Sequence, residues 1–241
     1  MYRTLYSEWG KTWSVRAPGA CLLLTGVVVA VTALSLANDV VLSAGDAKAP
    51  TAAGVPLVDV VAPALQFGQL VFAAFALQLI AAEYSTGSIR ATLQAQPRRA
   101  LVVLSKAVIA AACGALLGAL LGAATGEGAR LVLGDHEVPG QSLTALAIRA
   151  AALLALVGVL VVGLGALLRS AVGTLSAATV LLVGTLALPE TAGRWTPGPA
   201  GAAVLDGAAG SYSPGVGALV LAVWSAAVLA AGVWVVERRD A

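Results

Sequence analysis

Long apolar runs separated by short polar segments constrain most strongly what this chain can fold into. Such runs lie at about 19–37, 63–82, 101–125, 143–168, 171–188 and 214–236. A helix rises about 1.5 Å per residue and needs about 20 apolar residues to cross a bilayer. Only 11% of the residues are charged, whereas about a quarter are charged in soluble domains. The sequence therefore predicts an all-α polytopic membrane protein in which residues 18–241 form one domain with six transmembrane helices.

The first 17 residues form a segment of their own with an aromatic periodicity. Tyr2, Tyr6, Trp9 and Trp13 recur every three or four residues, which places their rings on one face of a helix. Rings on one side and bases on another are typical of a helix in the lipid headgroup layer. We therefore predict an interfacial cytoplasmic helix over residues 1–17, with an irregular tail as the alternative. Its characteristic residues are Tyr6, Trp9, Lys11, Trp13 and Arg16.

The distribution of basic residues predicts the orientation of the bundle. Six crossings place both termini on one side, together with the segments 82–106 and 169–170. That side contains Arg3, Lys11, Arg16, Arg90, Arg98, Arg99, Lys106, Arg169, Arg238 and Arg239. The other side contains Lys48, Arg130, Arg149 and Arg194. Because basic residues favour the cytoplasmic side of a membrane, we predict that both termini are cytoplasmic.

The segment between the second and third runs, residues 82–106, is the most densely charged part of the chain. We predict a cytoplasmic turn that contains a short polar helix. Glu83 ends the second predicted helix and can pair with Arg90, and Gly87 permits a sharp turn. The alternative is an ordinary anchoring loop that contacts no partner, since basic loops are expected on any cytoplasmic face.

Two sets of residues inside the predicted helices indicate helix contacts. The first set comprises three amides in the second helix, Gln66, Gln69 and Gln78. Buried amides need partners, so these side chains either line a pathway or form hydrogen bonds between helices. The second set is a stripe of glycines in the third helix, Gly114, Gly118, Gly122 and Gly126. Such a stripe lets another helix approach closely.

The sequence lacks the residue patterns of an enzyme with its own cofactor or metal. Residues 10–12 (GKT) resemble the end of a phosphate-binding loop, but the earlier glycine and a preceding strand are missing. His136 is the single histidine, and Cys21 and Cys113 lie in apolar runs without ligands at metal spacing. The net charge of +2 does not indicate a nucleic-acid partner. We predict a protein that is not an enzyme and binds no cofactor itself.

Three stretches of the chain carry a resemblance to a known family. Ser7–Arg16 (SEWGKTWSVR) is similar to an opening of the form S-E-W-x-K-x-x-S-V-R. Glu83–Leu93 (EYSTGSIRATL), followed by residues 97–99 (PRR), is similar to a cytoplasmic loop in which threonine usually takes the place of Ser88. Glu237–Ala241 (ERRDA) is similar to the ending of many members. With the six predicted helices, the chain resembles over its whole length the small permease subunits of bacterial type 2 ABC exporters.

The resemblance implies an export subunit of the bacterial inner membrane that has no ATPase of its own. Two permease subunits, identical or related, would form the translocation pathway as a dimer. A separate ATPase that binds ATP and Mg would dock on the loop between the second and third helices, supported by the N-terminal helix. The residues implied in this coupling are Glu83, Tyr84, Ser85, Thr86, Gly87, Ser88, Ile89 and Arg90. The alternative is a membrane anchor or regulator that binds a cytoplasmic partner and transports nothing.

Overall fold

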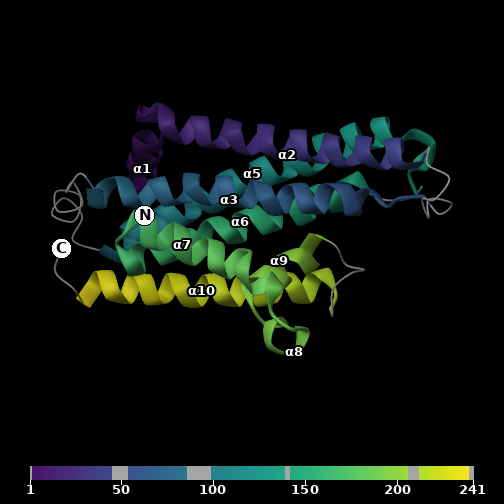
Figure 1. The fold of residues 1–241 in the computed structure, drawn as a ribbon. Coiled ribbons are helices and arrows are strands. Elements are labelled where there is room, and N and C mark those ends of the chain that lie inside the picture. Colours follow the sequence, from purple (N-terminus) through teal and green to yellow (C-terminus); the bar gives the residue numbers. More distant parts are fainter. Residues whose placement is uncertain (1, 45–53, 86–98, 139–141, 206–211, 239–241) are drawn as a thin grey trace.

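The computed structural model of the chain describes residues 2–44, 54–85, 99–138, 142–205 and 212–238. The described part is almost entirely helical, and its long helices lie side by side along one axis (Figure 1). Five helices are long and apolar enough to cross a membrane. They are α2 (Arg16–Ala44), α3 (Leu57–Ser85), α5 (Arg99–Leu133), α6 (Leu143–Leu168) and α10 (Pro214–Arg238). The predicted all-α class is confirmed, and the five helices are those of a multi-pass membrane protein.

Helix α6 forms the centre of the bundle. Leu153, Leu154, Val157 and Leu160 in its middle are fully buried, because α5, α10 and α3 all pack against it. Helices α2 and α10 are the least buried of the five. Their exposed apolar side chains, such as Leu23 of α2, suit a lipid environment rather than water.

The glycine stripe of α5 faces α6. A Cβ atom on Gly114 would lie 2.5 Å from the carbonyl oxygen of Leu154, and one on Gly122 would lie 2.9 Å from the Cα of Ala147. Gly118 is equally close to the backbone of Ala150, whereas Gly126 faces the side chains of Leu143 and Leu146. The two helices can pack this closely because no side chain separates their backbones.

The segment predicted as the fifth transmembrane helix, residues 171–188, is divided. α7 (Ala171–Leu182) has 12 residues and a length of about 18 Å, less than the roughly 30 Å of a hydrocarbon core. It is followed by η2 (Gly184–Ala187), α8 (Glu190–Gly193) and α9 (Pro197–Leu205). The hydroxyl of Thr185 donates to the carbonyl of Leu181 at 2.7 Å and accepts the backbone N–H of Gly198 at 3.1 Å. Thr185 therefore ties the break in the helix to the start of α9.

The short helices α7, α8 and α9 still lead the chain from the end of α6 to the opposite end of the bundle. α7 begins directly after α6, because Arg169 takes a left-handed conformation with φ of 54° and Ser170 accepts the N–H of Gly173. α8 and α9 lie toward the opposite end, and α10 then runs back (Figure 1). The N and C labels consequently lie at the same end of the bundle in Figure 1.

Helices α2, α3 and α5 extend well beyond the predicted runs, and α2 continues to Ala44. α3 begins at Leu57, so Pro63, the predicted first residue, lies inside it. α5 continues to Leu133 and is followed by η1 (Gly134–His136), so part of the predicted polar loop 126–142 is helical. Arg130 lies 3.1 Å from Glu137, which keeps the chain after α5 close to the helix.

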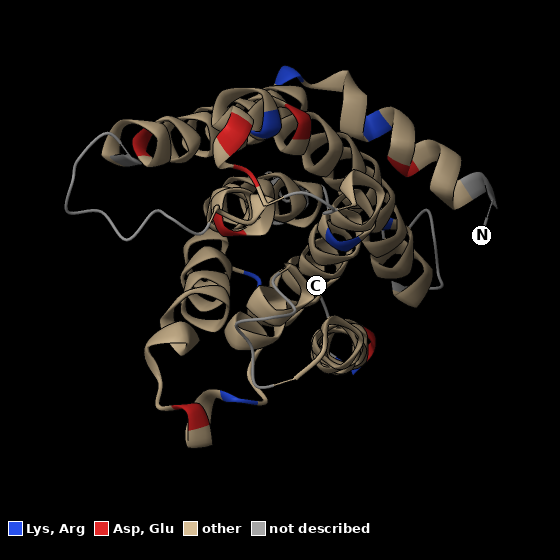
Figure 2. Cartoon of the chain, turned by 90° about the vertical axis from the view of Figure 1, so that its right-hand side faces the viewer, with Lys and Arg blue, Asp and Glu red and all other residues tan. Residues whose placement is uncertain are grey.

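The charged residues that the structure describes differ between the two ends of the bundle. The end opposite α1 faces the viewer in Figure 2. The helix ends there carry the acids Asp39, Asp59, Glu127, Asp135, Glu137 and Glu190, and the bases Arg130, Arg149 and Arg194. The end that contains α1 carries the bases Arg3, Lys11, Arg16, Arg99, Lys106, Arg169 and Arg238, and the acids Glu8, Glu83 and Glu237. Basic residues are therefore in excess only at the end where the termini lie.

Candidate functional site

Helix α1 (Tyr2–Ser14) lies at the end of the bundle where α10 ends (Figure 1). One face of α1 packs against α5 and α2. Glu8 and Thr12 are buried on this face, and Leu5 is partly buried there. The hydroxyl of Thr12 donates to the carbonyl of Glu8 at 2.9 Å, so it needs no partner in the bundle. The carboxyl group of Glu8 does have partners there.

A buried ion pair joins α1 to the bundle. The Oε2 atom of Glu8 lies 2.6 Å from the Nζ atom of Lys106 in α5, and both side chains are almost fully buried. Lys106 also donates a hydrogen bond of 2.7 Å to the carbonyl oxygen of Leu79 in α3. The Nζ atom of Lys11, a half-exposed residue, lies 2.7 Å from the Oε1 atom of Glu8. We call these four residues the junction, because they connect α1, α3 and α5.

The two lysines determine the charge of Glu8. Burial raises the pKa of a carboxyl group, because the charged form loses its water. In the junction, the charge and hydrogen bond of Lys106, together with those of Lys11, outweigh burial and hold the pKa of Glu8 below its ordinary value. Glu8 is therefore a carboxylate at neutral pH, and the junction is a charged network.

The aromatic face of α1 is exposed next to the junction. The side chains of Tyr6, Trp9 and Trp13 are 74%, 47% and 43% exposed. The rings of Trp9 and Trp13 meet edge to face, with centroids 5.5 Å apart. Arg16, at the start of α2, is exposed as well. The bundle thus leaves uncovered the residues that were predicted to meet lipid headgroups, apart from Lys11, which takes part in the junction.

The predicted coupling residues fall at the edge of the described part. Glu83, Tyr84 and Ser85 form the last turn of α3. Thr86, Gly87, Ser88, Ile89 and Arg90 lie outside the described residues. Because α5 begins at Arg99, the loop 86–98 connects two helices that both contribute to the junction.

The three predicted amides of α3 have different surroundings. The Nε2 atom of Gln78 donates to the Sγ atom of Cys21 at 2.8 Å, which joins α3 to α2. Gln69 is buried, and its Oε1 atom has no hydrogen-bond partner among the described residues. Gln66 lines a pocket. Of the three amides, only Gln78 forms a hydrogen bond to another helix among the described residues, and Gln66 faces the pocket.

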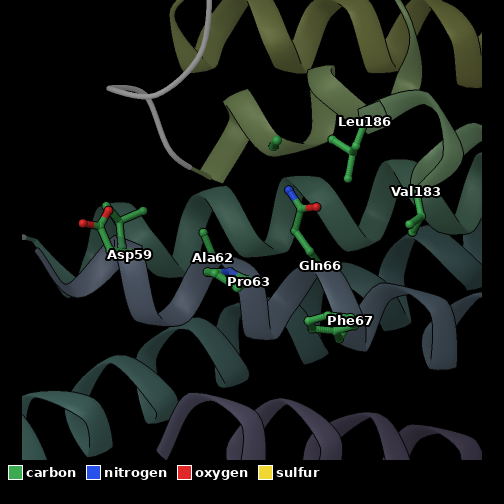
Figure 3. Close-up of a pocket in the computed structure, with 9 residues that line it drawn as sticks. Asp59, Ala62, Pro63, Gln66, Phe67, Val183 and Leu186 are labelled. Atoms are coloured by element: carbon green, nitrogen blue, oxygen red, sulfur yellow. The ribbon is translucent and has the colours of Figure 1, made fainter. Parts of the chain in front are cut away.

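The pocket has a volume of about 490 Å³ and lies between α3, the α7–η2 segment and α9. Asp59, Pro63, Gln66 and Phe67 contribute one wall, and Val183 and Leu186 contribute another. In Figure 3 Asp59 lies at one end, and the amide of Gln66 points across the space toward the segment that carries Leu186. We call this space the α3–α9 pocket.

Arg149 of α6 supports the α9 side of this region. Its Nη1 atom donates to the carbonyl oxygen of Leu205 at 3.2 Å, at the last residue of α9. A cation at the carboxyl end of a helix is favourable for its dipole. This backbone carbonyl is the described partner of Arg149.

Sequence reasoning did not find the Glu8–Lys106 pair, because the two residues are far apart in the chain. The signal was that Lys106 is followed by a long apolar run, where an ammonium group needs a partner. Across the described ranges, no His, Cys, Asp and Glu side chains gather in a group that could hold a metal ion. No family model, curated protein or solved structure matches the chain. Its function must therefore be inferred from its own residues.

Proposed function

We propose that this chain is the membrane-spanning permease subunit of an ATP-driven exporter of the type 2 ABC class, in the bacterial inner membrane. A second copy or a related permease would complete the translocation pathway. A separate ATPase, which binds ATP and Mg, would supply the energy from the cytoplasm. The proposal is supported by the three sequence stretches that resemble this family.

The observation that carries the proposal is the junction. Glu8 belongs to the Ser7–Arg16 stretch of the resemblance, and Lys106 lies about two turns after the start of α5. The loop 86–98 would therefore transmit any displacement directly to the part of α5 that holds α1. A subunit that is driven by an external ATPase needs a connection of this kind between its cytoplasmic loop and the bundle.

The proposed topology has six crossings and cytoplasmic termini. The basic end of the bundle would lie in the cytoplasm, as the distribution of charged residues favours. The α7–α9 segment would be the fifth crossing, with α9 dipping back beside protein. Short helices are tolerated at membrane depth where protein covers them, and Ala200, Ala203 and Val204 of α9 are buried. The exposed rings of α1 would lie in the headgroup layer.

The test is to purify the chain together with its proposed ATPase partner and to measure ATP hydrolysis in vesicles. Glu83→Ala and Arg90→Ala should lower permease-dependent ATP hydrolysis several-fold while the complex stays folded and inserted. Arg130→Ala, at the opposite end of the bundle, is the matched control and should retain hydrolysis. If the partner hydrolyses no nucleotide, the chain is a membrane anchor or regulator and the proposal is wrong.

A further inference from the structure

We propose that the α3–α9 pocket binds amphiphilic molecules with a hydrocarbon body and a cationic amine head, the amine lying toward Asp59. That such molecules are also the exported cargo rests on the proposed function; the binding itself does not. The inference follows from the size of the pocket, from its apolar walls and from two polar groups on one face of α3.

The size and lining of the pocket suit a small amphiphile. A volume of about 490 Å³ lies within the range of roughly 300–1,000 Å³ that is usual for small-molecule sites. Most of the lining is apolar, including Phe67, Val183 and Leu186. A hydrocarbon chain can therefore replace lipid or water against these apolar walls without loss of hydrogen bonds.

Gln66 is the polar group in the middle of the pocket. Its amide points across the space (Figure 3) and forms no hydrogen bond to any described residue, unlike Gln78 on the same helix. An amide in apolar surroundings costs free energy until a partner satisfies it. A ligand with a hydrogen-bonding group partway along its length would supply that partner.

Asp59 determines the charge of the preferred ligand. It is exposed and lies in the first turn of α3, seven residues before Gln66, so both side chains share one face about 10 Å apart along the helix. Pro63 lies between them on this face and contributes no N–H donor. A carboxylate at the mouth of an apolar pocket attracts a cationic head and repels an anionic one.

The experiment is site-directed photolabelling of the full-length protein in lipid nanodiscs. The two probes are dodecylamine and dodecanol, each with a diazirine on the alkyl chain, and labelled residues are mapped by mass spectrometry. The amine should label residues that line the pocket at several-fold lower concentration than the alcohol. Asp59→Asn should lower labelling by the amine roughly tenfold, about the effect of one hydrogen bond to a charged group, and leave the alcohol unchanged.

Two further variants keep the result interpretable. Ala202→Phe should fill the pocket from α9 and abolish labelling there by both probes. Asp39→Asn removes an exposed acid from the same end of the bundle, outside the pocket, and should have no effect. Equal labelling by amine and alcohol, or equal labelling of Asp59→Asn and the unmodified protein, would overturn the inference by indicating a lipid-chain site only. Because no ATPase is present, a failure of the proposed function would leave this result unaffected.

Discussion

Lys106 has the least expected surroundings of any charged residue that the structure describes. It is 5% exposed and sits in a helix that is otherwise apolar at this level. A buried ammonium group is tolerated only where opposite charge and hydrogen-bond acceptors surround it. Glu8 provides the charge and the carbonyl of Leu79 provides an acceptor. The docked position of α1 follows from the need of Lys106 for a carboxylate.

We expect Glu8→Gln to destabilise the protein by about 3 kcal/mol, because the substitution leaves the ammonium group of Lys106 buried without its counter-charge. Thermal unfolding of the purified protein in detergent measures the loss. Lys106→Met in the same chain should restore much of the stability, since neither charge is then left alone. Lys11→Met is the control and should cost no more than about 1 kcal/mol, because Lys11 is half-exposed. If the stability losses caused by the Glu8 and Lys106 substitutions simply add, the two side chains do not stabilise the protein as a pair.

The junction should also weaken in acid. The pKa of Glu8 lies below its ordinary value of 4.5 in the folded protein, so the ion pair contributes fully above that value and is lost as the pH falls through the lowered pKa. The stability difference between the unmodified protein and Glu8→Gln should therefore be constant from about pH 7 to about pH 5 and shrink below that. A difference that stays constant to about pH 3 would show that the charge of Glu8 does not hold α1.

At the level of single residues, the sequence predicted types of contact but not particular partners. The amides of α3 were expected to face either a pathway or another helix. Gln78 contacts α2, whereas Gln66 lines the α3–α9 pocket, and its place on a pathway stays a prediction. Both lie in the same apolar run, so composition cannot separate them. The difference arises because α2 covers Gln78, whereas the break in α7 leaves space beside Gln66.

The close contact between α5 and α6 is the part of the fold that the sequence indicated most directly. A four-residue glycine spacing leaves one side of a helix without side chains, and α6, against which α5 packs most extensively, occupies that side. The spacing could not name the partner helix, because every run in the chain is apolar enough to be the partner.

We expect Gly118→Ala to destabilise the protein by about 1–3 kcal/mol, because the new methyl group collides with the backbone at Ala150 of α6. Gly19→Ala in α2 is a matched control, since a Cβ atom there meets no atom within 4 Å. This control should be neutral or slightly stabilising, because alanine favours a helix more than glycine does. Both are measured by thermal unfolding in the same detergent. An equal effect of the two substitutions would show that α5 and α6 do not depend on close approach.

The fifth predicted helix differs from the others because a tertiary contact interrupts it. Residues 171–188 are as apolar as the other runs, so a hydropathy pattern predicts a continuous helix. In the folded chain the hydroxyl of Thr185 accepts the N–H of Gly198 and allows α9 to pack against the end of α7. A contact between residues in different elements leaves no periodic signal in the sequence.

At the scale of the whole molecule, the arrangement of the helices bears on whether the chain crosses the bilayer five or six times. Five helices are long enough to cross alone, which would place the termini on opposite sides. The course of the chain instead brings α1 and the last turn of α10 to one end of the bundle (Figure 1), because α7, α8 and α9 together lead back to the start of α10. The basic excess at this end agrees with cytoplasmic termini.

Cysteine labelling distinguishes the two topologies. In a chain with Cys21 and Cys113 replaced by alanine, single cysteines are placed at the exposed positions Ser14, Arg238 and Ser213. With six crossings, a membrane-impermeant maleimide should label Ser213→Cys in intact cells, because this residue precedes α10 at the far end. Ser14→Cys and Arg238→Cys should react only after the membrane is permeabilised, since both lie at the basic end. Five crossings would instead place these two cysteines on opposite sides, and only one of them would then be protected in intact cells.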